Sequence, residues 1–168
     1  MIVNSSSLLR AAPIKDMLTT KKRSHGVSHG LTEAGYDIRL KQDITFYAED
    51  NRPYVTVVEP SGSMKEYAGR FTLASAVEEF DMPSFLVGKV HDKSTWARHG
   101  LSVFNTVIEP GWKGFLTLEL VYHGQGMLYL PAGCGIAQIL FFETDHQSNY
   151  SGKYQNQADK PVEAILES

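Results

Sequence analysis

The chain has 168 residues, of which 42% are apolar and 21% are charged, and these values are ordinary for a soluble globular protein with a single core. Its net charge of −3 argues against a protein that binds duplex phosphates, and it has no apolar run near the roughly 20 residues that span a bilayer. We therefore expect no nucleic-acid partner, no membrane association and no secretory signal. The expected location is the cytoplasm, or the host cytoplasm if a phage encodes the chain.

The first 35 residues predict one helix followed by a loop. Residues 4–20 can hold a short helix capped by Asn4 or Ser5, which Pro13 limits or divides. Residues 20–35 are basic and then rich in Gly, Ser and His, a composition that predicts a loop.

From residue 36 the pattern is mostly β. The expected strands are 36–40, 44–47, 54–58, 70–74, 85–90, 101–108, 115–122, 127–130 and 136–142. Gly and Pro separate these short segments, which predicts a mainly β domain built as an antiparallel barrel or sandwich. Residues 92–100 predict one or two helical turns. We expect a single domain over residues 1–168, with the polar tail, 145–168, as a flexible arm that is disordered or orders on a ligand or partner.

Several common sites are absent from the sequence. Neither Gly-Lys pair is followed by Ser or Thr, so a P-loop is excluded. Zinc deaminases need a P-C-x-x-C pair of cysteines, whereas Cys134 is the only cysteine here. Its small and apolar neighbours predict a buried, inert thiol. Any deamination by this chain must therefore activate water without zinc.

Glu119 interrupts an apolar strand pattern. Alternation places it on the same face as Thr117 and opposite Leu118 and Leu120. It is either a solvent-facing residue on a half-buried strand or a carboxylate in a pocket, where desolvation raises its pKa toward that of a general base. A second polar cluster, Lys93 to Arg98, is either a solvated turn or a phosphate-binding segment with two cations and two hydroxyls.

Six ordered segments resemble motifs of the dCTP deaminases, within the dUTPase-like superfamily. They are 35–40 (GYDIRL), 71–75 (FTLAS), 86–101 (LVGKVHDKSTWARHGL), 108–119 (IEPGWKGFLTLE), 131–138 (PAGCGIAQ) and 152–157 (GKYQNQ). The similarity covers roughly residues 30–157. It implies a distorted dUTPase-like barrel or jelly roll.

The resemblance also implies roles for individual residues. Glu119 matches the catalytic glutamate, which takes a proton from the water that attacks C4 of cytosine and passes protons to N3 and the leaving ammonia. Ser94 and Arg98 match the residues that position this water and carboxylate. The residues expected to bind the nucleotide are Lys93, Thr95, Asn105, Thr106, Glu109, Gln138, Tyr150, Lys153 and Gln157. Tyr150, Lys153 and Gln157 belong to the tail that closes over the triphosphate.

The family further implies a homotrimer with shared sites and a magnesium ion bound through the nucleotide phosphates, with no metal ligand from the protein side chains. Two features depart from the family pattern. The segment 102–107 is about two residues shorter than in many members, so a 5-substituted cytosine is a possible substrate. Glu109 replaces an Asp that dUTPases use as general base, which argues against strong dUTPase activity. A dUTPase, a bifunctional enzyme and a non-catalytic nucleotide-binding regulator are the alternatives.

Overall fold

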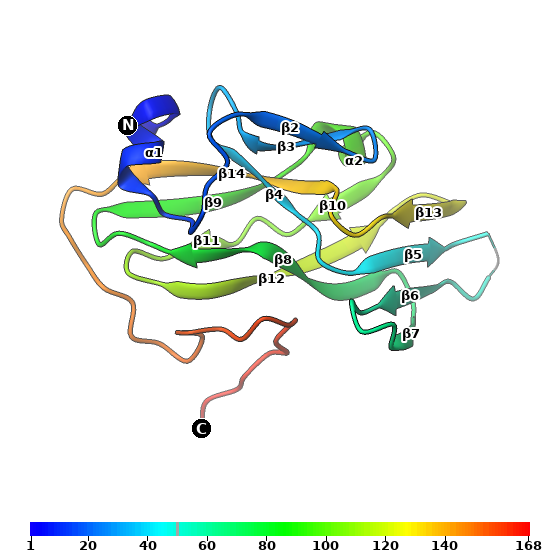
Figure 1. Ribbon diagram of the computed structural model, residues 1–168. Coiled ribbons are helices and arrows are strands. Elements are labelled where there is room, and N and C mark those ends of the chain that lie inside the picture. Colours follow the sequence, from blue (N-terminus) through cyan, green and yellow to red (C-terminus); the bar gives the residue numbers. More distant parts are fainter. Residues whose placement is uncertain (50) are drawn as a thin grey trace.

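Antiparallel strands form the framework of the computed structural model, which describes residues 1–49 and 51–168 (Figure 1). The strands are β1 (Ile2–Val3), β2 (Lys21–Ser24), β3 (Val27–Leu31), β4 (Tyr36–Arg39), β5 (Asp43–Tyr47), β6 (Tyr54–Val58), β7 (Met64–Ala68), β8 (Phe71–Asp81), β9 (Leu86–Asp92), β10 (Leu101–Val103), β11 (Val107–Ile108), β12 (Lys113–Tyr122), β13 (Met127–Leu130) and β14 (Gly135–Glu143). The helices are α1 (Ser5–Ala11) and α2 (Ser94–Ala97). The mainly β prediction with a short N-terminal helix is confirmed.

The strands form three antiparallel sheets. The largest has the order β11-β9-β14-β4-β3-β2, and β1 also pairs with β14. The other two are β10-β12-β8 and β13-β5-β6-β7. Over the described residues these antiparallel sheets do not close into a continuous barrel.

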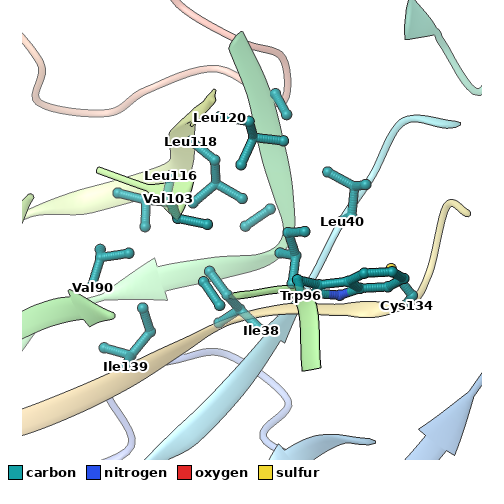
Figure 2. Packing of buried hydrophobic residues seen from close by; sticks show 14 of the residues in the cluster. Ile38, Leu40, Val90, Trp96, Val103, Leu116, Leu118, Leu120, Cys134 and Ile139 are labelled. Carbon is teal, nitrogen blue, oxygen red and sulfur yellow. The ribbon is translucent and has the colours of Figure 1, made fainter. Parts of the chain in front are cut away.

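Alternating strand residues from all three sheets meet in one hydrophobic core (Figure 2). On β12, Leu118 and Leu120 point into this core and are almost fully buried. Trp96 of α2 belongs to the same core and lies near Cys134 and Leu40 (Figure 2), and its indole N–H donates to the Gly135 carbonyl at 2.7 Å, which fixes α2 against β14. Burial raises the pKa of the Cys134 thiol to about 12, so it stays protonated and inert, as expected.

Two sequence predictions were wrong. Residues 20–35 are not a loop but the hairpin β2–β3, whose turn at His25 and Gly26 has two positive φ angles, as tight hairpin turns require. Residues 101–108 are not one strand: β10 pairs with β12 and β11 pairs with β9. Residues 104–106 connect these strands, because the chain there crosses from one sheet to another.

No helix in the described ranges has the length and apolarity needed to cross a membrane.

Candidate active site

A cavity of about 970 Å³ lies between the β6–β7 hairpin, one face of β8 and β12, and the C-terminal arm. Its walls are largely apolar, and a few polar side chains project into it. Its lining residues are Val57, Glu59, Ser61, Ser63, Lys65, Tyr67, Phe71, Thr72, Leu73, Thr106, Val107, Ile108, Glu109, Trp112, Leu116, Thr117, Glu119, Tyr150, Tyr154, Gln157, Lys160, Pro161, Val162, Glu163 and Ala164. Concave, mainly apolar sites with few polar groups are typical of small-molecule binding.

Glu119 lies in this cavity because of the alternation along β12. Leu118 and Leu120 face the core, so Thr117 and Glu119 face the cavity. The strand carries a register shift between Phe115 and Thr117, a bulge of the kind that re-aims side chains beside functional sites. The pocket interpretation of Glu119 is therefore the one that the structure supports.

The Glu119 carboxylate has no ion-pair or hydrogen-bond partner among the described residues for its buried Oε2 atom. Burial raises the pKa of Glu119 above its usual range, against a smaller opposing effect from a backbone hydrogen bond. A buried polar atom without a partner is unusual and costly to folding. A carboxylate held in this way is ready to accept a proton from a bound water.

Four of the predicted nucleotide-binding residues line the same cavity as Glu119. Thr106 and Glu109 come from the segment before β12, and Tyr150 and Gln157 come from the arm. The side chains of these four residues originate far apart in the sequence, and the fold brings them together around Glu119.

The C-terminal arm runs beside β12 in an irregular path with turns (orange to red in Figure 1) and is hydrogen-bonded to β12. The Trp112 indole N–H donates to the Tyr154 carbonyl at 2.6 Å, and the Thr117 hydroxyl donates to Gln157 Oε1 at 3.2 Å. The backbone at Gln157 runs so close to Gly114, whose φ is +128°, that no Cβ fits there. The arm thus forms one wall of the cavity.

Other predicted site residues lie away from Glu119. Ser94, Thr95 and Arg98 are on or next to α2, which packs against β10, and none of them lines the cavity. The side chains of Ser94 and Arg98 are exposed. Asn105 and Lys153 are exposed outside the cavity, and the Lys153 ammonium donates to the Ile165 carbonyl.

Lys93 and Gln138 belong to a different polar cluster, on the largest sheet. The Lys93 ammonium lies 2.5 Å from Asp37 Oδ2 and 2.9 Å from the Ser28 hydroxyl, and both charged side chains are nearly buried. Gln138 lies opposite Asp37 in the next strand and donates to the Thr32 hydroxyl at 3.3 Å. Within this chain the Lys93 ammonium is therefore already paired with the Asp37 carboxylate. A phosphate that binds Lys93 would have to share the ammonium with Asp37.

The Lys93–Asp37 pair makes a stability prediction. Asp37→Asn leaves the buried ammonium without its counter-charge, so we expect a loss of about 3–5 kcal/mol in the free energy of unfolding, measured by urea denaturation. Lys15→Ala breaks the exposed Lys15–Glu79 pair and should cost no more than about 1 kcal/mol. Equal losses in the two variants would contradict the importance of burial here.

Sequence reasoning missed several cavity residues. Lys65 and Tyr67 lie on β7, whose residues are all exposed and therefore carry no alternating apolar signal. Val162 reaches the cavity through its backbone N–H, which donates to the Thr117 hydroxyl at 3.0 Å. Phe71 lies in the motif 71–75, from which no role for its side chain was predicted. Its spacing of two from Leu73 nevertheless puts both side chains on one face of the strand.

Solved structures of similar shape define the fold. The dUTPase of EIAV superposes with a TM-score of 0.51 at 19% identity, covering 85% of this chain and 92% of that one. The 2′-deoxycytidine 5′-triphosphate deaminase of Agrobacterium tumefaciens superposes with a TM-score of 0.54 at 14% identity, covering 83% of this chain and 47% of that one. The fold is therefore dUTPase-like.

Sequence comparison identifies the family within this fold. The model of the dCTP deaminase-like family matches residues 8–144. The dCTP deaminase of Campylobacter jejuni is 34% identical over 83% of this chain and 83% of its own length. That of Acidobacterium capsulatum is 32% identical over 94% of this chain and 96% of its own length. The chain belongs to the dCTP deaminase-like family.

Proposed function

We propose that this chain hydrolyses dCTP to dUTP and ammonia, with Glu119 as the proton-transfer group. The observation that carries the proposal is the half-buried Glu119 side chain in a large cavity, with its buried Oε2 atom lacking a partner among the described residues. Curated relatives named dCTP deaminase, at 32–35% identity over most of the chain, support the same reaction.

In the proposed reaction Glu119 takes a proton from a water molecule that attacks C4 of cytosine. Glu119 passes this proton to N3, and then takes the remaining proton of the C4 hydroxyl and delivers it to the amino group, so ammonia leaves and the C4 carbonyl of uracil forms. One carboxylate can serve as base and then as acid, because the proton that it takes from water is the proton that it donates next. Desolvation makes the ionised form of Glu119 a stronger base than an exposed glutamate.

Ser94 and Arg98 are proposed to complete this site from a second copy of the chain, in a homotrimer. Both side chains are exposed, and within the described part of the chain neither makes a side-chain hydrogen bond or an ion pair. Both also lie outside the cavity of their own chain. A closed ring of three copies would let each α2 face the Glu119 cavity of a neighbour.

Magnesium belongs to the proposal as a companion of the substrate. Among the described residues, no three His, Cys, Asp or Glu side chains gather as a metal cage, and in the proposal the ion is carried by the triphosphate. Such an ion would neutralise phosphate charge, while the protein supplies polar groups such as Tyr150 and Gln157 on the arm.

We also propose a cytoplasmic location.

A turnover panel tests the function. We expect ammonia release from dCTP without pyrophosphate release, because Glu109 replaces the shorter carboxylate used for pyrophosphate cleavage. The panel holds dCTP, dCMP, CTP, 5-methyl-dCTP and dUTP, each with and without magnesium, with ammonia and pyrophosphate measured together. Pyrophosphate release from dUTP would instead identify a dUTPase or bifunctional enzyme. Tight binding without any turnover would identify a regulator.

A further inference from the structure

Two phenylalanines with half-exposed rings lie beside Glu119. Phe71 is 45% exposed and Phe104 is 50% exposed, and their ring centroids are 6.1 Å apart with planes inclined by 35°. Phe71 lines the cavity that contains Glu119, whereas Phe104 is not one of its lining residues and lies next to it through its ring pair with Phe71. Large apolar side chains exposed together are typical of a binding surface.

The strand register places both rings on the face that carries the Glu119 carboxylate. β12 is the middle strand of its sheet, and Leu73 of β8 lies directly opposite Glu119. Phe71 is two residues from Leu73, so its side chain has the same direction. On the other side, the Phe104 N–H donates to the Glu119 carbonyl at 3.0 Å and extends the β10–β12 ladder by one residue. The two phenylalanines therefore come from opposite sides of β12, on the face that carries the Glu119 carboxylate.

The short connection between β10 and β11 holds Phe104 in this place. The Thr106 N–H donates to the Phe104 carbonyl at 2.9 Å, and the Val90 N–H donates to the Thr106 carbonyl at 3.1 Å. Both ends of the connection are thus tied to strands of different sheets. Phe104 is fixed by its backbone while its ring stays open to ligand.

We propose that Phe71 and Phe104 form a stacking platform for the pyrimidine ring of the substrate. This proposal rests on the function proposed above and names the residues that determine how its base is held. A ring lying on the platform can turn its C4 edge toward the strand that carries Glu119. Aromatic faces attract any nucleobase through its π-face, so the platform supplies affinity without reading groups on the base edge.

This mode of binding has a consequence for specificity. A substituent at C5 lies in the plane of the pyrimidine ring and does not separate the ring from the platform. The cavity of about 970 Å³ leaves space beside the base. The platform therefore accepts cytosine and 5-methylcytosine with similar affinity.

The test measures binding in the absence of turnover. In a Glu119→Gln background, calorimetry gives the affinities for dCTP, 5-methyl-dCTP and inorganic triphosphate. Phe104→Ala and Phe71→Ala should each weaken binding of both nucleotides by about tenfold or more and leave the affinity for inorganic triphosphate unchanged. Phe104→Trp should keep nucleotide affinity, whereas Phe104→Leu, which retains apolar bulk without a π-face, should lose most of it.

Phe85→Ala is the matched control, because Phe85 is 39% exposed but lies in the turn before β9, outside the sheet β10-β12-β8 that carries Glu119. It should leave all three affinities unchanged. The proposal is overturned if Phe104→Ala leaves dCTP affinity intact, or if Phe104→Leu binds as well as Phe104→Trp. A fall in oligomer mass without a base-dependent loss of affinity would instead make the pair a subunit contact. Base-dependent binding by a wild-type chain that releases no ammonia would overturn the proposed reaction and leave the platform standing.

Discussion

We expect the Glu119→Gln variant to remain folded and to release ammonia from dCTP about 10²–10⁴-fold more slowly than wild type. Gln has nearly the same shape as Glu and cannot take a proton from water. The effect is large because the carboxylate acts in both halves of the proposed reaction. Steady-state ammonia release, with circular dichroism and Tm to verify folding, measures it.

Glu66→Gln is the matched control for this variant. Glu66 is exposed on β7 and does not line the cavity, so its replacement should leave the rate unchanged. Ammonia release retained by Glu119→Gln would remove Glu119 from the mechanism.

The pH profile gives a second measurement on the same carboxylate. Burial raises the pKa of Glu119, and the ionised form is the base, so kcat/KM should fall with decreasing pH at values above the usual glutamate range near about 4.3. Stability should change in the opposite direction. The pKa of Glu119 is higher in the folded state than in the unfolded state. The contribution of Glu119 to the free energy of unfolding therefore decreases as the pH rises from the unfolded-state pKa through the folded-state pKa. Glu119→Gln should therefore be as stable as wild type or more so at neutral pH.

Mixing two inactive variants should restore activity if the site is shared between copies. Arg98→Ala lacks the positioning cation and Glu119→Gln lacks the base. In randomly mixed rings, about a quarter of the sites would combine an intact Glu119 with an intact Arg98 from the neighbour. Refolding the two variants together should therefore return about a quarter of the wild-type rate of ammonia release.

The control for this experiment is a mixture of Glu119→Gln and Glu119→Ala, in which no site regains the base and no activity should return. Two differently tagged chains, purified through both tags, verify that mixed oligomers have formed. Lack of recovery in such oligomers would show that Arg98 acts within its own chain or has no role.

The sequence predicted the central strands well because their signals are local. β13 has the predicted bounds, and alternation around Glu119 gave the correct face. The hairpin β2–β3 was missed because β2 is polar and has no buried residue, so it carries no alternating apolar signal. β7 has no buried residue and carries no pattern at all.

The residues of the candidate site likewise differ in how far the sequence could predict them. Glu119 could be identified from its interruption of an apolar pattern together with the motif order. The partner of Lys93 could not, because Asp37 lies on a distant strand and reaches it only in the folded sheet. The path of the arm is equally non-local, since Thr117 accepts a hydrogen bond from the backbone of Val162.

The alternation along β12 restricts how this protein can evolve. A deletion or insertion of one residue between the bulge and Glu119 would turn the carboxylate into the core and expose Leu118 and Leu120. Changes in chain length near the site are therefore tolerated in connections, not in the strand. The connection at 104–106 is such a place, because it lies between strands of two different sheets. If Phe104 holds the base as proposed, substrate preference can diverge through this connection while Glu119, the proposed proton-transfer group, stays in register.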